Sequence, residues 1–155
     1  MLVKHFAVDI KIESVQQKLL LKDCSMSFLI SQRPKIKNIL DQINPIIHLK
    51  KHQYKFISFD YQELYAVKGS LKTCRDLSWH TDSQDNEYLI IAWGNKRTLF
   101  KTEISQLELD SGTLYQYDSS DIHCGQILNE GEKRVFLRIC FSNHLRPKNK
   151  ILFDF

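Results

Sequence analysis

A histidine and an aspartate stand two residues apart in the tripeptide His80-Thr81-Asp82. In an extended segment, side chains at positions i and i+2 point to the same side, so this imidazole and this carboxylate can share one metal ion. His123 lies further along, just beyond a segment that we predict to be a strand. A third ligand from a different strand would place two imidazoles and one carboxylate on one face of a metal. The opposite coordination positions would then stay open.

The composition of this ligand set favours iron over zinc. Zinc is more often held by cysteines or by three histidines. Two histidines and one carboxylate around a metal with open positions are typical of non-haem Fe(II) oxygenases. An HxD tripeptide also arises by chance, so the prediction depends on His123 and on the segment that follows it.

A cation follows the third histidine in the predicted strand 133–142. Arg134 lies at the start of this strand and Arg138 four residues later, on the same face as Phe136, Cys140 and Ser142. An arginine turned into the interior of a β-barrel is costly unless it meets an anion. The planar guanidinium fits a carboxylate in a bidentate manner. A dicarboxylate bound beside the metal would supply that anion, on Arg134 or, in a shifted register, on Arg138.

Together these segments resemble the Fe(II)/2-oxoglutarate-dependent dioxygenases. The resemblance rests on the order HxD, a strand that begins at a glycine, a histidine, and an arginine that opens the last core strand. It covers roughly the C-terminal half of the chain, in the segments WHTD (79–82), SGTLYQYDSSDIHCG (111–125) and GEKRVFLRICFS (131–142).

The resemblance implies a double-stranded β-helix of the jelly-roll or cupin type that binds Fe(II) through His80, Asp82 and His123. It further implies 2-oxoglutarate and O₂ as cosubstrates, with the distal carboxylate on Arg134 or Arg138. Such enzymes couple decarboxylation of 2-oxoglutarate to succinate with oxidation, usually hydroxylation, of a prime substrate. Here that substrate is open: a small molecule, a peptidyl residue or a nucleic-acid base. The alternative is a cupin-like metal-binding or sensing module without oxygenase activity, which would not need Arg134.

One amphipathic helix is predicted in the N-terminal part of the chain. Ser31 is expected to cap it and Pro34 to occupy its first turn. Pro45 is expected to end it, since the residue before a proline avoids the helical region. Its apolar stripe predicts packing against a sheet and consists of Ile36, Ile39, Leu40 and Ile43.

Strand patterns dominate after residue 52. Strands are predicted at 53–61 with a continuation at 64–68, at 88–93, 97–102, 112–117 and 133–142, and at the tail 151–155. Gly94-Asn95-Lys96 is interpreted as the turn of a hairpin between 88–93 and 97–102. The chain is thus predicted to be mainly β, one domain over 1–155. Residues 1–52 would form a helical and strand support, and residues 53–155 a jelly-roll core with the metal site.

Composition sets broad limits on location and partners. No segment has the length and apolar character of a membrane span or a secretory signal, so a cytoplasmic protein without a membrane partner is expected. The four cysteines (Cys24, Cys74, Cys124, Cys140) form no CxxC pair and are predicted to be free, mostly buried thiols. Residues 1–79 carry 13 Lys+Arg and 7 Asp+Glu, against 9 and 11 for the rest. This excess favours an anionic partner or is a solvated lysine-rich surface.

Other chemistry-bearing residues have simpler interpretations. His48 and His52 lack the glutamate of an HExxH motif and are expected on the surface. Cys124 points away from His123 if both are on a strand, which argues against a Cys-His nucleophile. Asp121 either orients the imidazole of His123 or forms the turn before it. The aromatic residues Trp79, Trp93, Tyr115 and Tyr117 are expected in the core, although the two tyrosines could reach a cosubstrate.

Overall fold

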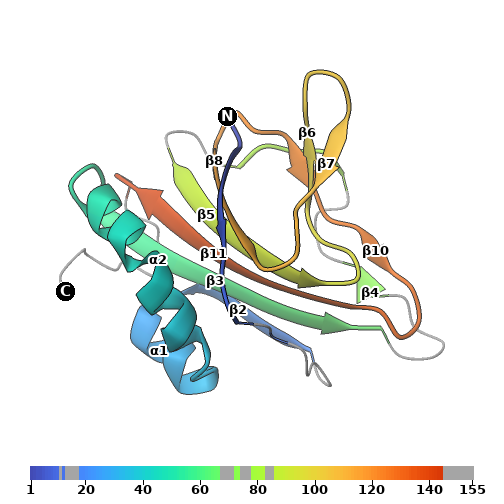
Figure 1. The fold of residues 1–155 in the computed structure, drawn as a ribbon, viewed down its shortest axis with the longest axis horizontal. Coiled ribbons are helices and arrows are strands. Elements are labelled where there is room, and N and C mark those ends of the chain that lie inside the picture. The colour runs from blue at the N-terminus through green and yellow to red at the C-terminus, as the bar shows by residue number, and fades with distance from the viewer. Residues whose placement is uncertain (11, 13–17, 67–71, 74–77, 83–85, 145–155) are drawn as a thin grey trace.

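The computed structural model describes residues 1–10, 12, 18–66, 72–73, 78–82 and 86–144, without the side chains of residues 72 and 73. This described part of the chain is mainly β, as predicted, with antiparallel strands and two helices (Figure 1). Its largest element is a six-stranded sheet in the order β1-β8-β5-β11-β3-β2. The strands of this sheet are β1 (Val3–Ala7), β8 (Thr113–Asp118), β5 (Glu87–Gly94), β11 (Lys133–Ser142), β3 (Phe56–Tyr65) and β2 (Leu19–Cys24).

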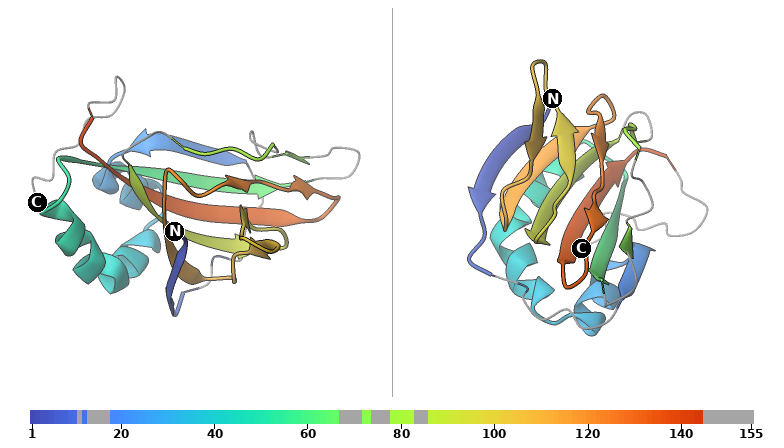
Figure 2. Two further views of the ribbon diagram at one scale, coloured as in Figure 1. Left: turned by 90° about the horizontal axis from the view of Figure 1, so that it is seen from above. Right: turned by 90° about the vertical axis from the view of Figure 1, so that its right-hand side faces the viewer.

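Two smaller sheets make up the remaining β structure of the described residues. One has the order β7-β6-β9, and the other pairs β10 with β4. Their strands are β4 (Lys72–Thr73), β6 (Leu99–Lys101), β7 (Gln106–Glu108), β9 (His123–Cys124) and β10 (Ile127–Leu128). The helices lie against one face of the six-stranded sheet, whereas the β6–β7 hairpin stands on the other side (Figure 2).

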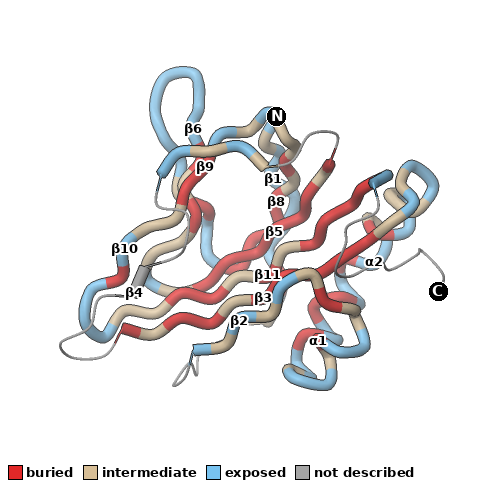
Figure 3. The backbone as a smooth tube through the Cα atoms, turned by 180° about the vertical axis from the view of Figure 1, so that it is seen from behind, coloured by how far each residue is buried: buried red, intermediate tan, exposed pale blue. Residues whose placement is uncertain are grey.

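Strict alternation along β11 separates two cores. Val135, Leu137, Ile139 and Phe141 are buried in the cluster that includes the helices. Arg134, Phe136, Arg138 and Cys140 occupy the opposite face, where Phe136 and Cys140 join a second apolar cluster. The predicted shared face of Arg134 and Arg138 is therefore confirmed. The central strands carry most of the buried residues (Figure 3).

The N-terminal segment forms two helices where one was predicted. Helix α1 (Met26–Gln32) begins at Ser25, whose hydroxyl accepts a hydrogen bond from the backbone N–H of Phe28. Ser31 lies inside α1 and donates to the Phe28 carbonyl, so its prediction as a cap is wrong. A serine hydroxyl can accept from a backbone N–H at a helix start or donate to a carbonyl within a helix, and the sequence around Ser31 did not distinguish the two.

Helix α2 (Ile36–Lys51) continues through Pro45, so the prediction that this proline ends the helix is also wrong. Pro45 lies on the exposed side of α2, where water can satisfy the Asp41 carbonyl that lacks its usual N–H donor. The buried stripe, which outweighs this local cost, runs along the sheet side as predicted and extends to Ile47. It consists of Ile36, Ile39, Leu40, Ile43 and Ile47.

Most strand predictions after residue 52 are confirmed, with shifted ends. The predicted strand 133–142 coincides with β11, and 112–117 corresponds to β8. The hairpin between 88–93 and 97–102 is wrong, because β5 pairs with β8 and β11, whereas β6 pairs with β7 and β9. The predicted tail strand 151–155, residues 67 and 68, and Cys74 lie outside the described residues. Neither described helix has the length and apolar character needed to cross a bilayer.

Gly94 explains why the chain leaves the sheet here instead of forming a hairpin. It has φ +102°, and a Cβ at this position would lie 2.3 Å from the Lys133 carbonyl oxygen. The backbone N–H of Asn95 donates to that same carbonyl at 2.8 Å, and the side chain of Asn95 accepts from Lys133 N. The turn is thus tied to the start of β11, not to β6.

We expect Gly94→Ala to lower the free energy of unfolding by about 3 kcal/mol, because backbone strain adds to a steric clash. Gly131 is the matched control: it has φ +78°, but a Cβ added there would have no described neighbour within 4 Å. Gly131→Ala should therefore cost only the strain of the left-handed conformation, about 1 kcal/mol. Urea denaturation measures both. Equal losses would contradict the role of the close approach.

Candidate metal centre

The backbone places the two histidines directly opposite each other. His80 and His123 form an antiparallel bridge, in which His80 N donates to His123 O at 3.0 Å and His123 N donates to His80 O at 2.9 Å. Residues directly opposite in an antiparallel pair project their side chains to the same side. The imidazole rings accordingly lie with their centroids 4.5 Å apart.

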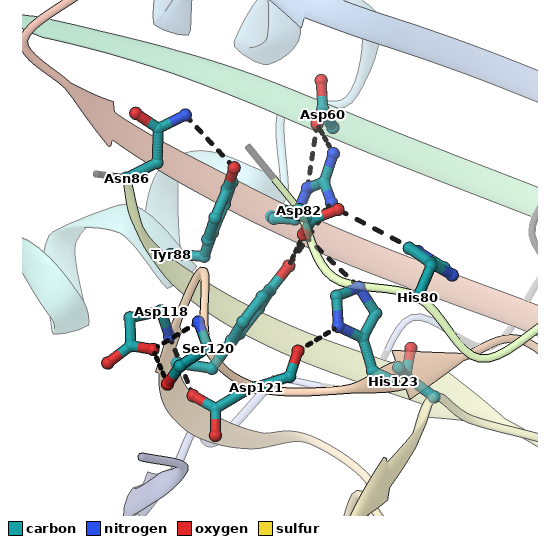
Figure 4. Close-up of polar contacts among 12 residues, drawn as sticks. Asp60, His80, Asp82, Asn86, Tyr88, Asp118, Ser120, Asp121 and His123 are labelled. Carbon is teal, nitrogen blue, oxygen red and sulfur yellow. Dashed lines mark hydrogen bonds and ion pairs between the residues drawn. The ribbon is translucent and has the colours of Figure 1, made fainter. Parts of the chain in front are cut away.

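Asp82 completes the cluster that the sequence predicts (Figure 4). One ligand atom from each of His80, Asp82 and His123 lies within 4.8 Å of the other two. The Nε2 atom of His123 is 3.3 Å from Asp82 Oδ2, and the Nε2 atom of His80 is 3.9 Å from Asp82 Oδ1. His123 is buried, whereas the other two side chains are partly exposed. The structure thus brings together three donor groups from segments far apart in the chain.

Hydrogen bonds to the backbone fix which imidazole nitrogen faces the cluster. The Nδ1 atom of His80 lies 2.8 Å from the Ser78 carbonyl oxygen, and that of His123 lies 3.1 Å from the Asp121 carbonyl oxygen. A carbonyl only accepts, so Nδ1 carries the proton in both rings. In each neutral imidazole, Nε2 then presents a lone pair towards the carboxylate of Asp82. Such convergent lone pairs repel one another unless a cation lies among them, so the residues present fit a bound metal ion.

Asp82 is held in its charged form. Burial raises the pKa of this carboxyl group, but in the metal-free protein the contact with His123 in its protonated form, the charge of Arg138 and the hydrogen bond from Tyr117 together lower it by more. The pKa of Asp82 therefore lies well below its ordinary value. A carboxylate that stays ionised near neutral pH is available as a metal ligand without proton release.

Asp121 orients His123 through its backbone rather than through its carboxylate. The Asp121 carbonyl receives the imidazole Nδ1–H, while the Asp121 side chain accepts a hydrogen bond from Asp118 N at 2.9 Å. Both alternatives for this residue thus hold in part, because the side chain forms the turn and the main chain holds the ring. Cys124 follows His123 on β9 and, like Cys24 and Cys140, is a buried thiol outside any disulfide, as predicted.

A cavity of about 210 Å³ adjoins the cluster and contains both predicted arginines. Its walls come from β2, β3, β5, β8, β9 and β11, and include His80, His123, Thr98, Tyr117, Arg134 and Arg138. Arg134 is only 4% exposed, and its Nη2 donates to Thr98 Oγ1 at 2.8 Å. A guanidinium in such low-dielectric surroundings interacts strongly with any anion that enters beside it.

Arg138 is occupied by two carboxylates of the protein. Its Nε and Nη2 atoms donate to Asp60 Oδ2 at 3.0 and 2.6 Å, and its Nη1 donates to Asp82 Oδ2 at 3.1 Å. Burial by itself lowers the pKa of this guanidinium. The electrostatic effects of Tyr117, Asp60 and Asp82 raise it by a larger amount, so the net pKa lies well above the ordinary value. The sequence interpretation missed Asp60 and the role of Tyr117. The available signal was that Asp60 is the one acidic residue in the predicted strand 53–61.

Gln62 adds an acceptor to the cavity wall. It pairs with Phe136 of β11 and Leu20 of β2, and its Oε1 is buried without a hydrogen bond from any described residue. At neutral pH 2-oxoglutarate, the cosubstrate that the resemblance implies, carries acceptors only, so it would not satisfy this atom. A water or a ligand with an N–H or O–H group can.

Removing this acceptor should stabilise the ligand-free protein. We expect Gln62→Met to raise the free energy of unfolding by about 1–3 kcal/mol, the desolvation cost of a buried unsatisfied group. Gln126 is the matched control, since its Nε2 donates to Arg97 O at 2.7 Å. Gln126→Met should lower stability. Urea unfolding of the two variants should therefore give changes of opposite sign, and a loss of stability in both would refute the assignment.

The remaining candidates lie away from the cluster. His48 and His52 are exposed near the C-terminal end of α2, in agreement with the surface interpretation. Helix α2 also carries Lys37, which pairs with Asp41, and Lys50, which pairs with Glu87. This helix covers the face of the sheet opposite the cavity, so its lysines do not line the cluster. Trp93, Tyr115 and Tyr117 are buried as predicted, but the prediction that Trp79 lies in the core is wrong, because its side chain is exposed. Of these four aromatic residues, Tyr117 donates a hydrogen bond to the candidate ligand Asp82.

Comparisons with known proteins add no family to these observations. No model of a known protein family matches the chain, and no curated protein matches it either.

Proposed function

We propose that the protein is an Fe(II)- and 2-oxoglutarate-dependent oxygenase, with hydroxylation as its most natural outcome. One observation carries the proposal. The three ligand atoms of His80, Asp82 and His123 converge beside a cavity whose wall contains a buried arginine, Arg134. A metal site alone needs no such cation. A metal that shares its cavity with a desolvated guanidinium is suited to a ligand with a metal-chelating end and a distal carboxylate.

The strand pairings support a double-stranded β-helix of the jelly-roll type. From β3 onwards, successive segments alternate between sheets: β3, β5, β8 and β11 belong to the large sheet. The segments between them, namely β4, then β6 and β7, then β9 and β10, belong to the small sheets. We take β9 and β10, separated by only two residues, as one interrupted strand. Two facing sheets linked in this way are the arrangement of jelly rolls and cupins.

Arg134 is the better candidate for the distal carboxylate. Arg138 already neutralises part of the charge of Asp60 and Asp82, so a third carboxylate would compete with both. Arg134 lies four residues along the same face of β11, about 13 Å away in strand length. A ligand that starts at the metal and extends along β11 would reach Arg134, with Thr98 as a second polar contact.

Each group of residues in the site has its own role in the proposed reaction. His80, Asp82 and His123 would hold Fe(II), and Arg134 would orient 2-oxoglutarate so that its keto acid end faces the metal. Bound Fe(II) supplies the activation of O₂ that oxidises 2-oxoglutarate to succinate and CO₂ and the prime substrate to its product. The apolar cluster around Tyr88, Ile90 and Phe100 would limit water near the metal. Small molecules, peptidyl residues and nucleic-acid bases all remain within the proposed substrate range.

Anaerobic titration tests the proposal directly. Fe(II) and 2-oxoglutarate added together should give a visible charge-transfer band that neither gives alone, because a keto acid chelates the metal. Admission of O₂ should then release succinate in amounts that depend on Fe(II). A protein that binds one metal ion tightly but gives no band and no succinate would instead be the cupin-like binding or sensing module.

A further inference from the structure

The two carboxylate oxygens of Asp82 have different surroundings. Oδ2 accepts hydrogen bonds from Tyr117 OH at 2.9 Å and from Arg138 Nη1 at 3.1 Å, and it also lies 3.3 Å from His123 Nε2. Oδ1 has only the longer approach of His80 Nε2, at 3.9 Å, among the described residues. Oδ2 is thus engaged by two protein donors, whereas no donor of the described residues lies within hydrogen-bond distance of Oδ1.

Arg138 is itself fixed by a group on the neighbouring strand. Asp60 lies directly opposite Arg138 in the β3–β11 ladder and receives two of its N–H groups. The other oxygen of Asp60 accepts a hydrogen bond from Asp23 N at 2.7 Å, which fixes the carboxylate in turn. Both side chains thus extend from central strands, which position a group more precisely than loops do.

The charges of Asp60 and Arg138 also affect how strongly Asp82 attracts a metal ion. Asp60 and Arg138 balance each other, so the negative charge of Asp82 remains for a metal ion. Without Asp60, the guanidinium would be paired with Asp82 alone and would compete with an incoming cation. Tyr117 adds a donor to Oδ2 and no charge, because burial raises the pKa of this phenol well above its ordinary value.

We propose that Asp60, Arg138 and Tyr117 form a positioning unit that engages Asp82 Oδ2, so that Asp82 offers Oδ1 alone to the metal. Arg138 is then a positioning residue, not the group that binds the distal carboxylate. This inference rests on the metal-binding part of the proposed function and does not depend on 2-oxoglutarate.

A charge-matched double variant separates positioning from simple electrostatics. Asp60→Asn/Arg138→Met removes one negative and one positive charge, so the net charge beside Asp82 is unchanged. If the unit positions Asp82, Mn(II) affinity of the metal-free protein should fall about 10–100-fold, the usual effect of removing a group that orients a ligand. If Arg138 only repels cations, the affinity should stay equal or rise, and the proposal is overturned.

A milder variant keeps the test sound if the double variant does not fold. Tyr117→Phe should weaken Mn(II) binding about 3–10-fold through the loss of one hydrogen bond to Asp82. Tyr115→Phe is the matched control: Tyr115 lies two residues earlier on the same face of β8, and its hydroxyl donates to Asp110. It should leave Mn(II) affinity unchanged. Equal affinity of both tyrosine variants and the wild type would overturn the proposal.

The Mn(II) dissociation constant can be measured by electron paramagnetic resonance, and the visible spectrum of bound Co(II) reports a change in coordination. A merely structural role would leave that spectrum unchanged in the variants that still bind Co(II), whereas release of Asp82 Oδ2 should alter it. Wild-type protein that binds Mn(II) but never 2-oxoglutarate would refute the proposed oxygenase and leave this inference intact. Wild-type protein that binds no metal would refute both.

Discussion

Replacement of His80 or Asp82 by alanine is expected to abolish stoichiometric Fe(II) binding. Each residue supplies one of the three donor atoms that converge within 4.8 Å, and no other described His, Cys, Asp or Glu joins that group. Two remaining donors cannot fix a metal against water with comparable affinity. Anaerobic equilibrium dialysis followed by metal analysis should give about one Fe(II) per wild-type chain and close to none for either variant.

Two controls exclude trivial causes. His48→Ala removes an exposed imidazole on α2 and should keep the wild-type iron content. Asp82→Asn keeps the shape of the side chain, so its thermal unfolding reports whether the fold survives the loss of charge. If either His80→Ala or Asp82→Ala retained the full iron content, the assignment of the metal centre would be wrong.

The sequence predicts which side chains of one segment share a face, because the alternation of side chains along an extended chain is a local property. His80 and Asp82 are two apart, and Arg134 and Arg138 are four apart on one face of β11. Both relations depend only on each segment being extended. The structure places the side chains on the expected sides for that reason.

Contacts between distant segments are not readable in this way. Asp60 and Arg138 are separated by 78 positions, and their pairing depends on the register between β3 and β11. The mistaken hairpin has the same origin. In the sequence, Gly94 resembles the turn between two paired strands. In the structure, its close approach to the Lys133 carbonyl oxygen ties the turn to β11 instead. This contact can be recognised only once the position of β11 beside Gly94 is known.

The helix errors show tertiary packing overriding a local preference. Pro45 removes one hydrogen bond of α2, a cost that a propensity argument treats as decisive. The five buried residues of the α2 stripe lie on both sides of that position, four before it and Ile47 after it. Burial of each such side chain contributes about 1.5–3 kcal/mol, so continuing the helix to bury Ile47 offsets much of the local loss.

Removal of the Arg134 guanidinium is expected to weaken 2-oxoglutarate binding by about 1.5–3 kcal/mol, the scale of a charge-assisted hydrogen bond. The dissociation constant should thus rise about 10- to 150-fold in Arg134→Met. Isothermal titration calorimetry with Mn(II)-loaded protein measures this without turnover. Lys133→Met is the matched control, because the adjacent residue has the same charge and the opposite orientation on β11.

Arg138→Leu distinguishes the two arginines. At Mn(II) concentrations that saturate every variant, it should weaken 2-oxoglutarate binding less than Arg134→Met does, because Arg138 is already paired with Asp60 and Asp82. Arg134→Lys should fall between Arg134→Met and the wild type, since a lysine keeps the charge but loses the bidentate fork. The reverse ranking of Arg134→Met and Arg138→Leu would move the carboxylate to Arg138. In that case the ion pairs of Arg138 with Asp60 and Asp82 would have to open when the cosubstrate binds.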